Sequence, residues 1–378
     1  MGKIPLYFLF LFAPCSLLIS FEGLEYTHLK LPETSDFDDC TTANQSIHLL
    51  KIDPLYYEIK PVKALDNGIG RESVLSINTR HGAAASINGG FFSIGGAFDG
   101  KACGTLKIHD WYALPTKPRG CIGWSLNDQQ PIMDRLLVKL SAETPSKKFS
   151  IDGLNRPRNE AEIILFTPSF HKTTLTNPDG EEILVVDGII QSIKKGASTK
   201  IPENGFVLSI QKQHPLFNTF ELKTPLTITT HIDPLMEITS KDSWDSLDFI
   251  VAGAPLLLYN DTKIIDFAPE NILPSFLLNR HARTAVGLLP NGNWLFVVVD
   301  KTDCFEGMTI VELTKLMQRL GCTHALNLDG GGSSTMVYQG IIKNSPHGDE
   351  DEGAGQNTVR RVSDAIIAVP RHSPANIK

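Results

Sequence analysis

Short apolar runs that end at glycine, proline or asparagine dominate the chain from Ala83 onward. Runs of this length with such ends are typical of β-strands separated by turns. The clearest of them are AAASINGGFF, EIILFTP, EILVVDG, FVLSI, LTITTHI, DFIVAGAPLLLY, TAVGLL, WLFVVVD and AIIAVP. No repeat of fixed period runs through these segments. The pattern therefore predicts a strand-rich fold.

One segment, GMTIVELTKLMQRLG, has the pattern of an amphipathic helix instead. Thr309 and Glu312 have the spacing of a capping box, and Gly321 stands where a helix usually ends. Apolar residues recur at helical spacing on one face: Ile310, Leu313, Met317 and Leu320. Strand-like runs flank the helix, so we expect a βαβ unit with parallel strands. The predicted class is α+β, a strand-rich mixed sheet with flanking helices and one βαβ unit near the C-terminus.

Two acids stand at the ends of the strands of this unit. Asp300 ends the first strand and Asp329 ends the second. Both strands of a βαβ unit end at one edge, where ligands bind in such sheets. A hairpin with Asn291-Gly292 as its two-residue loop would also place Arg283 opposite Asp300 on one face. A slip of one residue would separate this pair, and an ordinary salt bridge is the alternative reading.

A glycine-rich loop follows the second acid. Gly330 and Gly331 come directly after Asp329, and Ser333 and Ser334 add hydroxyl groups. A strand-like TMVY follows and no lysine is present, which excludes a P-loop. We expect backbone N–H groups of this loop to face an anion, and a purely structural glycine turn is the alternative.

Further candidates for a binding site lie in three other segments. SINGGFFS repeats the pattern of a strand followed by glycines, and RRVSDAIIAVP and NRHARTAVG carry arginines, whose planar fork suits phosphate oxygens. Ordinary turns and solvated surface residues are the alternatives. The residues selected as substrate-binding candidates from these segments are Asn88, Gly89, His281, Arg361 and Ser363.

The ends of the chain and its charge suggest where the protein acts. The apolar run Ile4–Ile19 follows a lysine and resembles a signal peptide, with a membrane anchor as the alternative. We expect a signal peptide over residues 1–20, a lead-in region over 21–75, one domain over 76–370 and a tail over 371–378. The protein would then act outside the cytoplasm, as a periplasmic, secreted or lumenal protein. A net charge of −7 makes nucleic acid an unlikely partner.

Five cysteines follow the predicted signal peptide, and none forms a C-x-x-C pair, so a structural zinc site is not expected. Cys103 with Cys121, and Cys304 with Cys322, could form disulfides in an exported protein. Buried free thiols are the equal alternative.

Taken together, these segments resemble the phosphodiester glycosidase family. The resemblance rests on INGGFF, NRPR, IPENGFVLS, AGAPLLL, RTAVG, FVVVD, the helical segment, ALNLDGGGSSTMV and RRVSDAIIAV, which span about residues 83–369. It implies hydrolysis of a sugar-1-phosphodiester between sugar and phosphate. It also implies that Asp329, Asp300 and Arg283 are catalytic. Asp300-Lys301-Thr302 departs from the family's common Asp-Gly-Arg, and Phe305 replaces a common serine.

The chemistry of these side chains fits that reaction. Asp329 would be nucleophile or base, and Asp300 would orient Arg283 or act as acid. The expected partner is a sugar phosphodiester or a phosphorylated polysaccharide, with membrane contact only through an uncleaved N-terminal segment. No cofactor is expected. One alternative is a surface protein that binds polysaccharide or sugar phosphate without cleaving it. Another is a phosphodiesterase in which Asp300 and Asp329 hold a divalent cation.

Overall fold

A computed structural model describes residues 22–31, 44–127, 130–196, 198–236, 239–348 and 359–371. The predicted signal peptide lies outside these residues, as do most of the predicted tail and Cys40. Strands form most of the regular structure, which confirms the strand-rich prediction. Within the described residues, no helix is long and apolar enough to cross a membrane.

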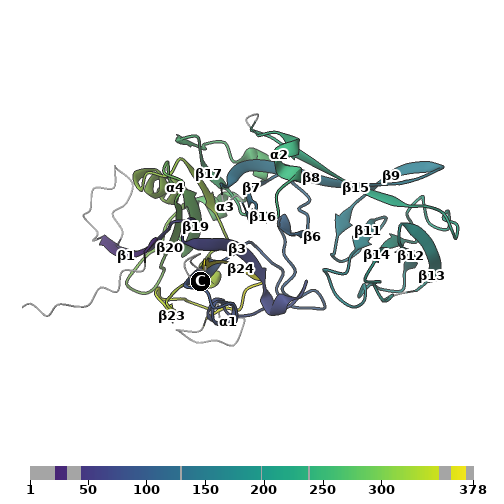
Figure 1. The fold of residues 1–378 in the computed structure, drawn as a ribbon, viewed down its shortest axis with the longest axis horizontal. Helices are drawn as coiled ribbons and strands as arrows, with labels where there is room; N and C mark the ends of the chain where they lie inside the picture. The colour runs from purple at the N-terminus through teal and green to yellow at the C-terminus, as the bar shows by residue number, and fades with distance from the viewer. Residues whose placement is uncertain are drawn as a thin grey trace, which may run out of the picture.

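Two sheets form the main body, at the left of Figure 1. The first, in spatial order, contains β1 (Leu24–Leu31), β2 (Gln45–Ile52), β20 (Trp294–Val299), β19 (Arg283–Leu288), β21 (His324–Asn327), β17 (Leu256–Tyr259) and β18 (Thr262–Lys263). The second contains β23 (Ile341–Ile342), β22 (Met336–Tyr338), β4 (Ala85–Asn88), β24 (Asp364–Pro370) and β3 (Tyr57–Lys63).

A third sheet leads from the main body to a smaller lobe. It contains β15 (Thr227–Pro234), β8 (Ile132–Thr144), β7 (Arg119–Trp124), β16 (Phe249–Ala252), β5 (Leu106–Ile108) and β6 (Asp110–Ala113), with β9 (Lys147–Ile151) beside β8. The long strands β8 and β15 reach the lobe at the right of Figure 1. The lobe contains β10 (Gly153–Leu154), β11 (Ile163–Phe166), β14 (Gly205–Gln211), β12 (Gly180–Val186) and β13 (Ile189–Lys195).

The predicted helix is confirmed as α4 (Ile310–Arg319). Thr309 caps it, and Glu312 completes the capping box. Gly321 follows with φ of +80°, as a helix-ending glycine should. The structure also contains three shorter helices and three 3-10 turns that the sequence pattern did not predict. They are α1 (Val74–Arg80), α2 (Lys241–Asp245) and α3 (Pro274–Leu278), and η1 (Ala64–Asp66), η2 (Ala268–Glu270) and η3 (Gly331–Ser333).

The predicted βαβ unit is not confirmed. Strand, helix and strand do follow one another as β20, α4 and β21, but β19 lies between the two strands and pairs antiparallel with both. They therefore run in the same direction without touching. Among the described strands, only β10 and β11 pair in parallel. The crossover rule correctly predicted that β20 and β21 run in the same direction. It could not predict that β19 lies between them, because that placement depends on packing across the whole sheet.

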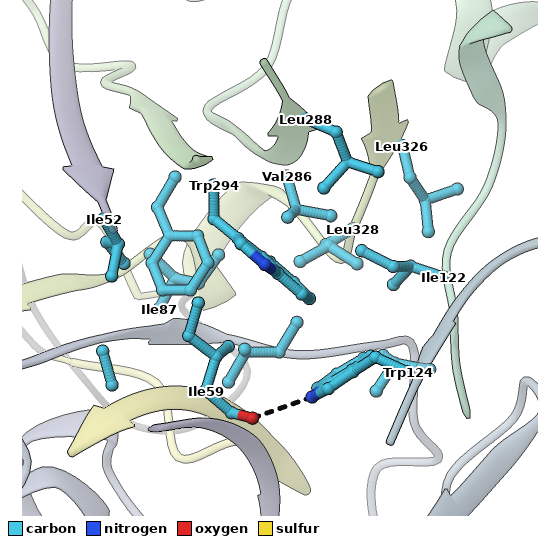
Figure 2. Close-up of a cluster of buried hydrophobic side chains, with 14 of the residues drawn as sticks. Ile52, Ile59, Ile87, Ile122, Trp124, Val286, Leu288, Trp294, Leu326 and Leu328 are labelled. Atoms are coloured by element: carbon cyan, nitrogen blue, oxygen red, sulfur yellow. Dashed lines mark hydrogen bonds between the residues drawn. The ribbon is translucent and has the colours of Figure 1, made fainter. Parts of the chain in front are cut away.

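The central strands of the first sheet, β17, β19 and β20, are buried on both faces, which explains their continuous apolar runs. Leu295 and Val297 of β20 pack in the cluster that contains the apolar face of α4. Trp294 points into the buried cluster drawn in Figure 2, and Phe296 belongs to the same cluster. There Trp124 meets Trp294 at 5.0 Å between ring centroids and donates a 2.7 Å hydrogen bond to the carbonyl oxygen of Ile59.

Strands from the predicted lead-in region complete both main sheets. β2 pairs with β20, and β3 pairs with β24 near the end of the chain. β4 and β24 lie side by side in the second sheet, and the N-terminal end of β24 meets the C-terminal end of β4. This meeting point is where the candidate site forms.

Candidate active site

The ends of β4 and β21 meet through the backbone around Asp329. The Asp329 amide donates to the Gly89 carbonyl oxygen at 3.2 Å, and the Asn88 side-chain amide donates to the Asp329 carbonyl oxygen at 2.8 Å. The Asn88 oxygen accepts from the Thr284 hydroxyl and the Thr335 amide. Asn88 is fully buried, so it fixes three segments to one another. The structure thus brings the two glycine-bearing segments together.

The glycines of the loop are required by close approach and by backbone shape. Gly331 has φ of +59°, which side chains rarely adopt. A Cβ atom on Gly330 would lie 2.8 Å from the Ala282 carbonyl oxygen. A Cβ atom on Gly332 would lie 2.9 Å from the guanidinium carbon of Arg360. A side chain at Gly330 or Gly332 would push the loop away from its neighbours, and one at Gly331 would strain the backbone.

The predicted anion-binding nest of backbone N–H groups is not present in the expected form. The Gly330 amide donates to the carboxylate of Asp329 itself at 2.9 Å. The amide of Gly331 donates to Ala282, that of Ser333 to Gly330, and that of Ser334 to Gly331. Since these donors already have protein acceptors, the loop shapes the position of Asp329 and does not offer those N–H groups to an anion.

A second carboxylate and a guanidinium complete the cluster around Asp329. Arg360 is 8% exposed and donates to the Ser333 hydroxyl at 3.3 Å. Asp364, at the start of β24, accepts from the Gly90 amide at 3.0 Å and from the Ser363 hydroxyl. A Cβ atom on Gly89 would lie 1.8 Å from the Asp364 carboxylate, so glycine is required there as well.

Burial raises the pKa of Asp329 to about 6. The Ser333 hydroxyl, the Gly330 amide and the positive charge of Arg360 oppose this rise, and the negative charge of Asp364 adds to it. Asp329 nevertheless keeps part of its surface in contact with solvent, as do Gly330 and Gly331. Asp329 is thus accessible, lies next to a guanidinium and has a pKa close to neutral pH. These properties suit a carboxylate for acid–base or nucleophilic catalysis.

The predicted pair of Arg283 and Asp300 does not form, because the hairpin register differs by one residue. Arg283 lies opposite Val299, and the connection is a three-residue loop over 290–292 in which Gly292 has φ of +85°. Arg283 therefore lies on the α4 side of the sheet, only 1% exposed. Its guanidinium donates to the carbonyl oxygens of Met308, Phe276 and Asn279 at 2.8–2.9 Å. Burial lowers its pKa to about 10.

Asp300 is buried on the opposite side of the sheet. Its carboxylate accepts from Ser46 at 2.8 Å and from the Ser345 amide at 2.8 Å, and it lies 2.9 Å from a ring nitrogen of His48. Burial favours a higher pKa, but these partners outweigh it and lower the pKa of Asp300 below its usual value. Asn344, which also contacts Asp300, donates to the Ser334 carbonyl oxygen, so Asp300 reaches the glycine loop only indirectly.

The remaining predicted residues fall into different environments. Ser333 and Ser363 contact the cluster, and Ser334 is buried in the loop beside it. Arg361 is exposed. His281 pairs with Met308 through its backbone, and burial, then Arg283 and Lys301, lower its pKa.

Sequence reasoning did not select Arg360 or Asp364 as site residues. The sequence did carry a signal for both residues. In an extended segment Arg360, Val362 and Asp364 lie on the same side, and the apolar Val362 indicates that this side faces inward. Val362 is indeed buried, through a bridge to Glu72.

The cysteines of the described residues form no disulfide. Cys103, Cys121, Cys304 and Cys322 are free thiols, so neither proposed disulfide forms. Across the described residues, no three or more histidine, cysteine, aspartate or glutamate side chains are grouped to hold a metal ion.

Comparison with known proteins places the chain in a family. The model of the phosphodiester glycosidase family matches residues 179–369, just over half of the chain. The chain belongs to this family, which confirms the resemblance drawn from its motifs. An uncharacterized protein of Rickettsia conorii is 28% identical over 231 residues, or 58% of this chain and 76% of that one.

A curated enzyme and two solved structures are also similar. Bovine N-acetylglucosamine-1-phosphodiester alpha-N-acetylglucosaminidase is 33% identical over 94 residues, which are 25% of this chain and 18% of the enzyme. A hypothetical protein of Synechocystis has a TM-score of 0.77 at 21% identity, over 93% of this chain and 62% of that one. A proposed exported protein of Burkholderia pseudomallei has a TM-score of 0.72 at 21% identity, over 88% and 75%. The two structures share the fold.

Proposed function

We propose that this protein hydrolyses the bond between the anomeric carbon of a sugar and the phosphate of a sugar-1-phosphodiester. The observation that carries the proposal is the partly exposed Asp329, with its raised pKa, held between Ser333 and Arg360 in a member of the phosphodiester glycosidase family. The bovine relative is named for activity on a sugar-1-phosphodiester, which supports the same class of substrate.

In this proposal Asp329 delivers the nucleophile to the anomeric carbon, either as its own carboxylate or as a water molecule that it deprotonates. The bond between that carbon and the phosphate oxygen breaks, and the phosphate leaves with the electron pair. Arg360 stabilises the charge on the leaving phosphate, and the buried Ser333 hydroxyl positions Arg360 beside Asp329. Water supplies the new hydroxyl group, so the products are a free sugar and a phosphomonoester.

The other predicted catalytic residues take supporting places in this proposal. Arg283 and Asp300 are 1% and 2% exposed, and protein atoms already fill their hydrogen bonds. Arg283 therefore holds the carbonyl groups of 276, 279 and 308 together beneath the site. Asp300 holds the segment of Asn344 and Ser345 that supports Ser334.

We also propose that the protein acts outside the cytoplasm. The apolar pattern of residues 4–19 and the similarity to a proposed exported protein support this location. Cell fractionation of the full-length protein tests this location.

The test is a panel of sugar-1-phosphodiesters with mass-spectrometric identification of both products. Wild-type protein should release free sugar and leave the phosphate on the other half. Asp329→Asn should lower the rate by about a hundredfold or more, as loss of a catalytic carboxylate does. Asp261→Asn, an exposed position with φ of +60°, is the matched control and should retain full activity. Normal turnover by Asp329→Asn would disprove the assignment.

A further inference from the structure

An apolar pocket of about 240 Å³ lies beside the Asp329 segment. Its walls include Phe91, Ile272, Leu273 and Phe276, with Cys103 and Arg119 also lining it. The rings of Phe91 and Phe276 meet edge to face at 5.9 Å between centroids. Leu273 leaves 72% of its surface exposed. A monomeric protein keeps an open apolar hollow of this kind mostly where a ligand binds.

Three walls of this pocket are attached to the same short stretch of chain. Phe91 lies two residues after Gly89, whose carbonyl oxygen accepts from the Asp329 amide. On the second wall, Ala254 exchanges hydrogen bonds with Asn327, two residues before Asp329.

The third wall is formed by Phe276. Its ring lies over the guanidinium of Arg283 at 4.7 Å, and the neighbouring Ala282 carbonyl oxygen accepts from the Gly331 amide. The pocket therefore shares its supports with the loop that holds the carboxylate.

The backbone between the carboxylate and the pocket carries little side-chain bulk. Gly90, Gly330 and Gly331 each keep part of their surface exposed, as does Phe91. A substrate that places its phosphate near Arg360 and Ser333 can cross these glycines without meeting a Cβ atom.

We propose that this pocket is a subsite for a carbon-rich group of the substrate next to its phosphate, either an alkyl or aryl alcohol or the C–H face of a pyranose. The two aromatic rings supply flat apolar surface, and the pocket is too small for more than one such group. The inference rests on the proposed function for the position of the phosphate. It adds that the enzyme selects substrates by a group outside the bond that is cleaved.

Protection of Cys103 from alkylation tests the pocket without relying on hydrolysis. Cys103 is exposed and lines the pocket, whereas Cys304 is exposed elsewhere and serves as a control within the same molecule. Intact protein is treated with iodoacetamide, and labelling of each cysteine is followed by peptide mass spectrometry. The probes are methyl phosphate, hexyl phosphate and a hexose 1-phosphate.

We expect hexyl phosphate or the hexose 1-phosphate to slow labelling of Cys103 at concentrations where methyl phosphate does not. Labelling of Cys304 should not change. Protection by hexyl phosphate assigns the pocket to the alcohol, and protection by the hexose 1-phosphate assigns it to the sugar. Equal effects of all three probes on Cys103, or none from any of them, would overturn the proposal.

Phe91→Ala should raise the concentration of the probe that protects Cys103 by about tenfold, because the substitution removes apolar contact in the pocket. Leu278→Ala is the matched control, because Leu278 belongs to α3 but is 67% exposed and does not line the pocket. Protection without hydrolysis would leave the subsite standing while the proposed reaction fails. Hydrolysis without protection of Cys103 would support the proposed reaction and overturn the subsite.

Discussion

The charge of Asp329 is decided by opposing neighbours within one small volume. Burial removes water from the carboxylate and favours the neutral form, and nearby Asp364 acts in the same direction. The Ser333 hydroxyl, the Gly330 amide and Arg360 favour the ionised form, and the balance is a pKa of about 6. Such a carboxylate is mostly ionised at neutral pH and is more basic than an exposed one. It is thus fitted to attack, or to take a proton from water.

This balance predicts the acid limb of the pH–rate profile. The ionised form of Asp329 is the active one, so kcat/KM should rise with pH and reach half its plateau near pH 6. Arg360→Gln removes a charge that lowers the pKa, and the limb should move to higher pH. Asp364→Asn removes a charge that raises the pKa, and the limb should move to lower pH. Steady-state rates from pH 4 to 8 measure both shifts.

Shifts of the two variants in the same direction would contradict this account of the charges. Asp261→Asn, far in sequence and exposed, should leave the profile unchanged. The sequence identified Asp329 correctly as a group at a strand end, because a carboxylate followed by glycines is a local signal. It selected Arg361 and not Arg360, since the inward turn of Arg360 depends on the bridge between Val362 and the distant Glu72.

Elements whose signals are local were predicted well, and those whose register depends on packing were not. The helix α4 was predicted down to its capping box, because Thr309 and Glu312 lie within one turn. The hairpin of β19 and β20 was also predicted, but with a loop one residue too short. Asn-Gly suits both a two-residue turn and the last positions of a three-residue loop. The core, which takes Phe296 and Val298 on one face, selects the register.

The loop of this hairpin offers a test at the same scale. Gly292 has φ of +85°, and a Cβ atom there would meet no other atom within 4 Å. Gly292→Ala should therefore lower the free energy of unfolding by about 1 kcal/mol through backbone strain alone. Gly292→Asn should cost less, because asparagine tolerates this conformation better than alanine. Urea unfolding of both variants measures the difference. An equal cost for the two would contradict a left-handed backbone at this position.

The whole molecule closes on itself by pairing early strands with late ones. β2 lies beside β20, β3 lies beside β24, and the site forms where β4, β21 and β24 meet. Strand order of this kind depends on contacts between distant residues, so the sequence predicted the strands and not their neighbours. The separation of Arg283 from Asp300 by a sheet follows from the same limit, because a slip of one residue exchanges the two faces.

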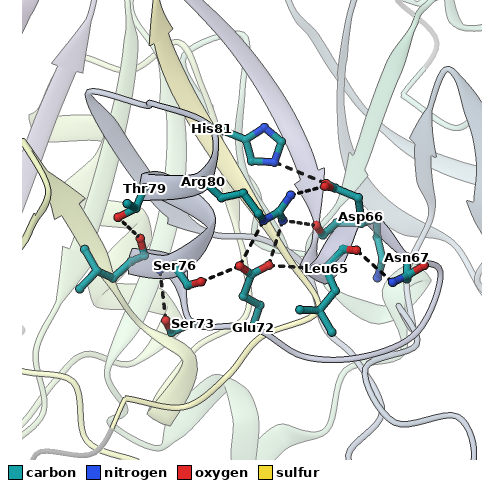
Figure 3. Close-up of polar contacts among 11 residues, drawn as sticks. Leu65, Asp66, Asn67, Glu72, Ser73, Ser76, Thr79, Arg80 and His81 are labelled. Atoms are coloured by element: carbon teal, nitrogen blue, oxygen red, sulfur yellow. Dashed lines mark hydrogen bonds and ion pairs between the residues drawn. The ribbon is translucent and has the colours of Figure 1, made fainter.

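A polar corner around the buried carboxylate of Glu72 ties residues 65–80 to the segment that carries Arg360. The carboxylate of Glu72 accepts from the Leu65 amide, the Ser76 hydroxyl and Arg80, which also pairs with Asp66 (Figure 3). The backbone of Glu72 exchanges hydrogen bonds of 2.9 and 3.0 Å with Val362. Burial favours a higher pKa for Glu72, but Arg80 and the other donors outweigh it, so its pKa lies below the usual value.

Removal of the Glu72 carboxylate should therefore destabilise the fold and disturb the segment that carries Arg360. Glu72→Ala leaves three donors without their acceptor and should lower the free energy of unfolding at pH 7 by about 3 kcal/mol. The difference should fade as the pH drops through the lowered pKa, because the protonated wild-type side chain binds Arg80 weakly. Glu58→Ala, in the half-exposed pair with Lys60, should cost less than about 1 kcal/mol.

Hydrogen exchange at Val362 follows the local effect, since its amide donates to the Glu72 carbonyl oxygen. We expect faster exchange there in Glu72→Ala than in Glu58→Ala. The hydrogen bond from Arg360 to Ser333 should weaken as a result. If Val362 exchanged at the wild-type rate in a destabilised Glu72→Ala protein, the corner would stabilise the fold without positioning the site. The hydrogen bond between Arg360 and Ser333 would then not depend on this corner.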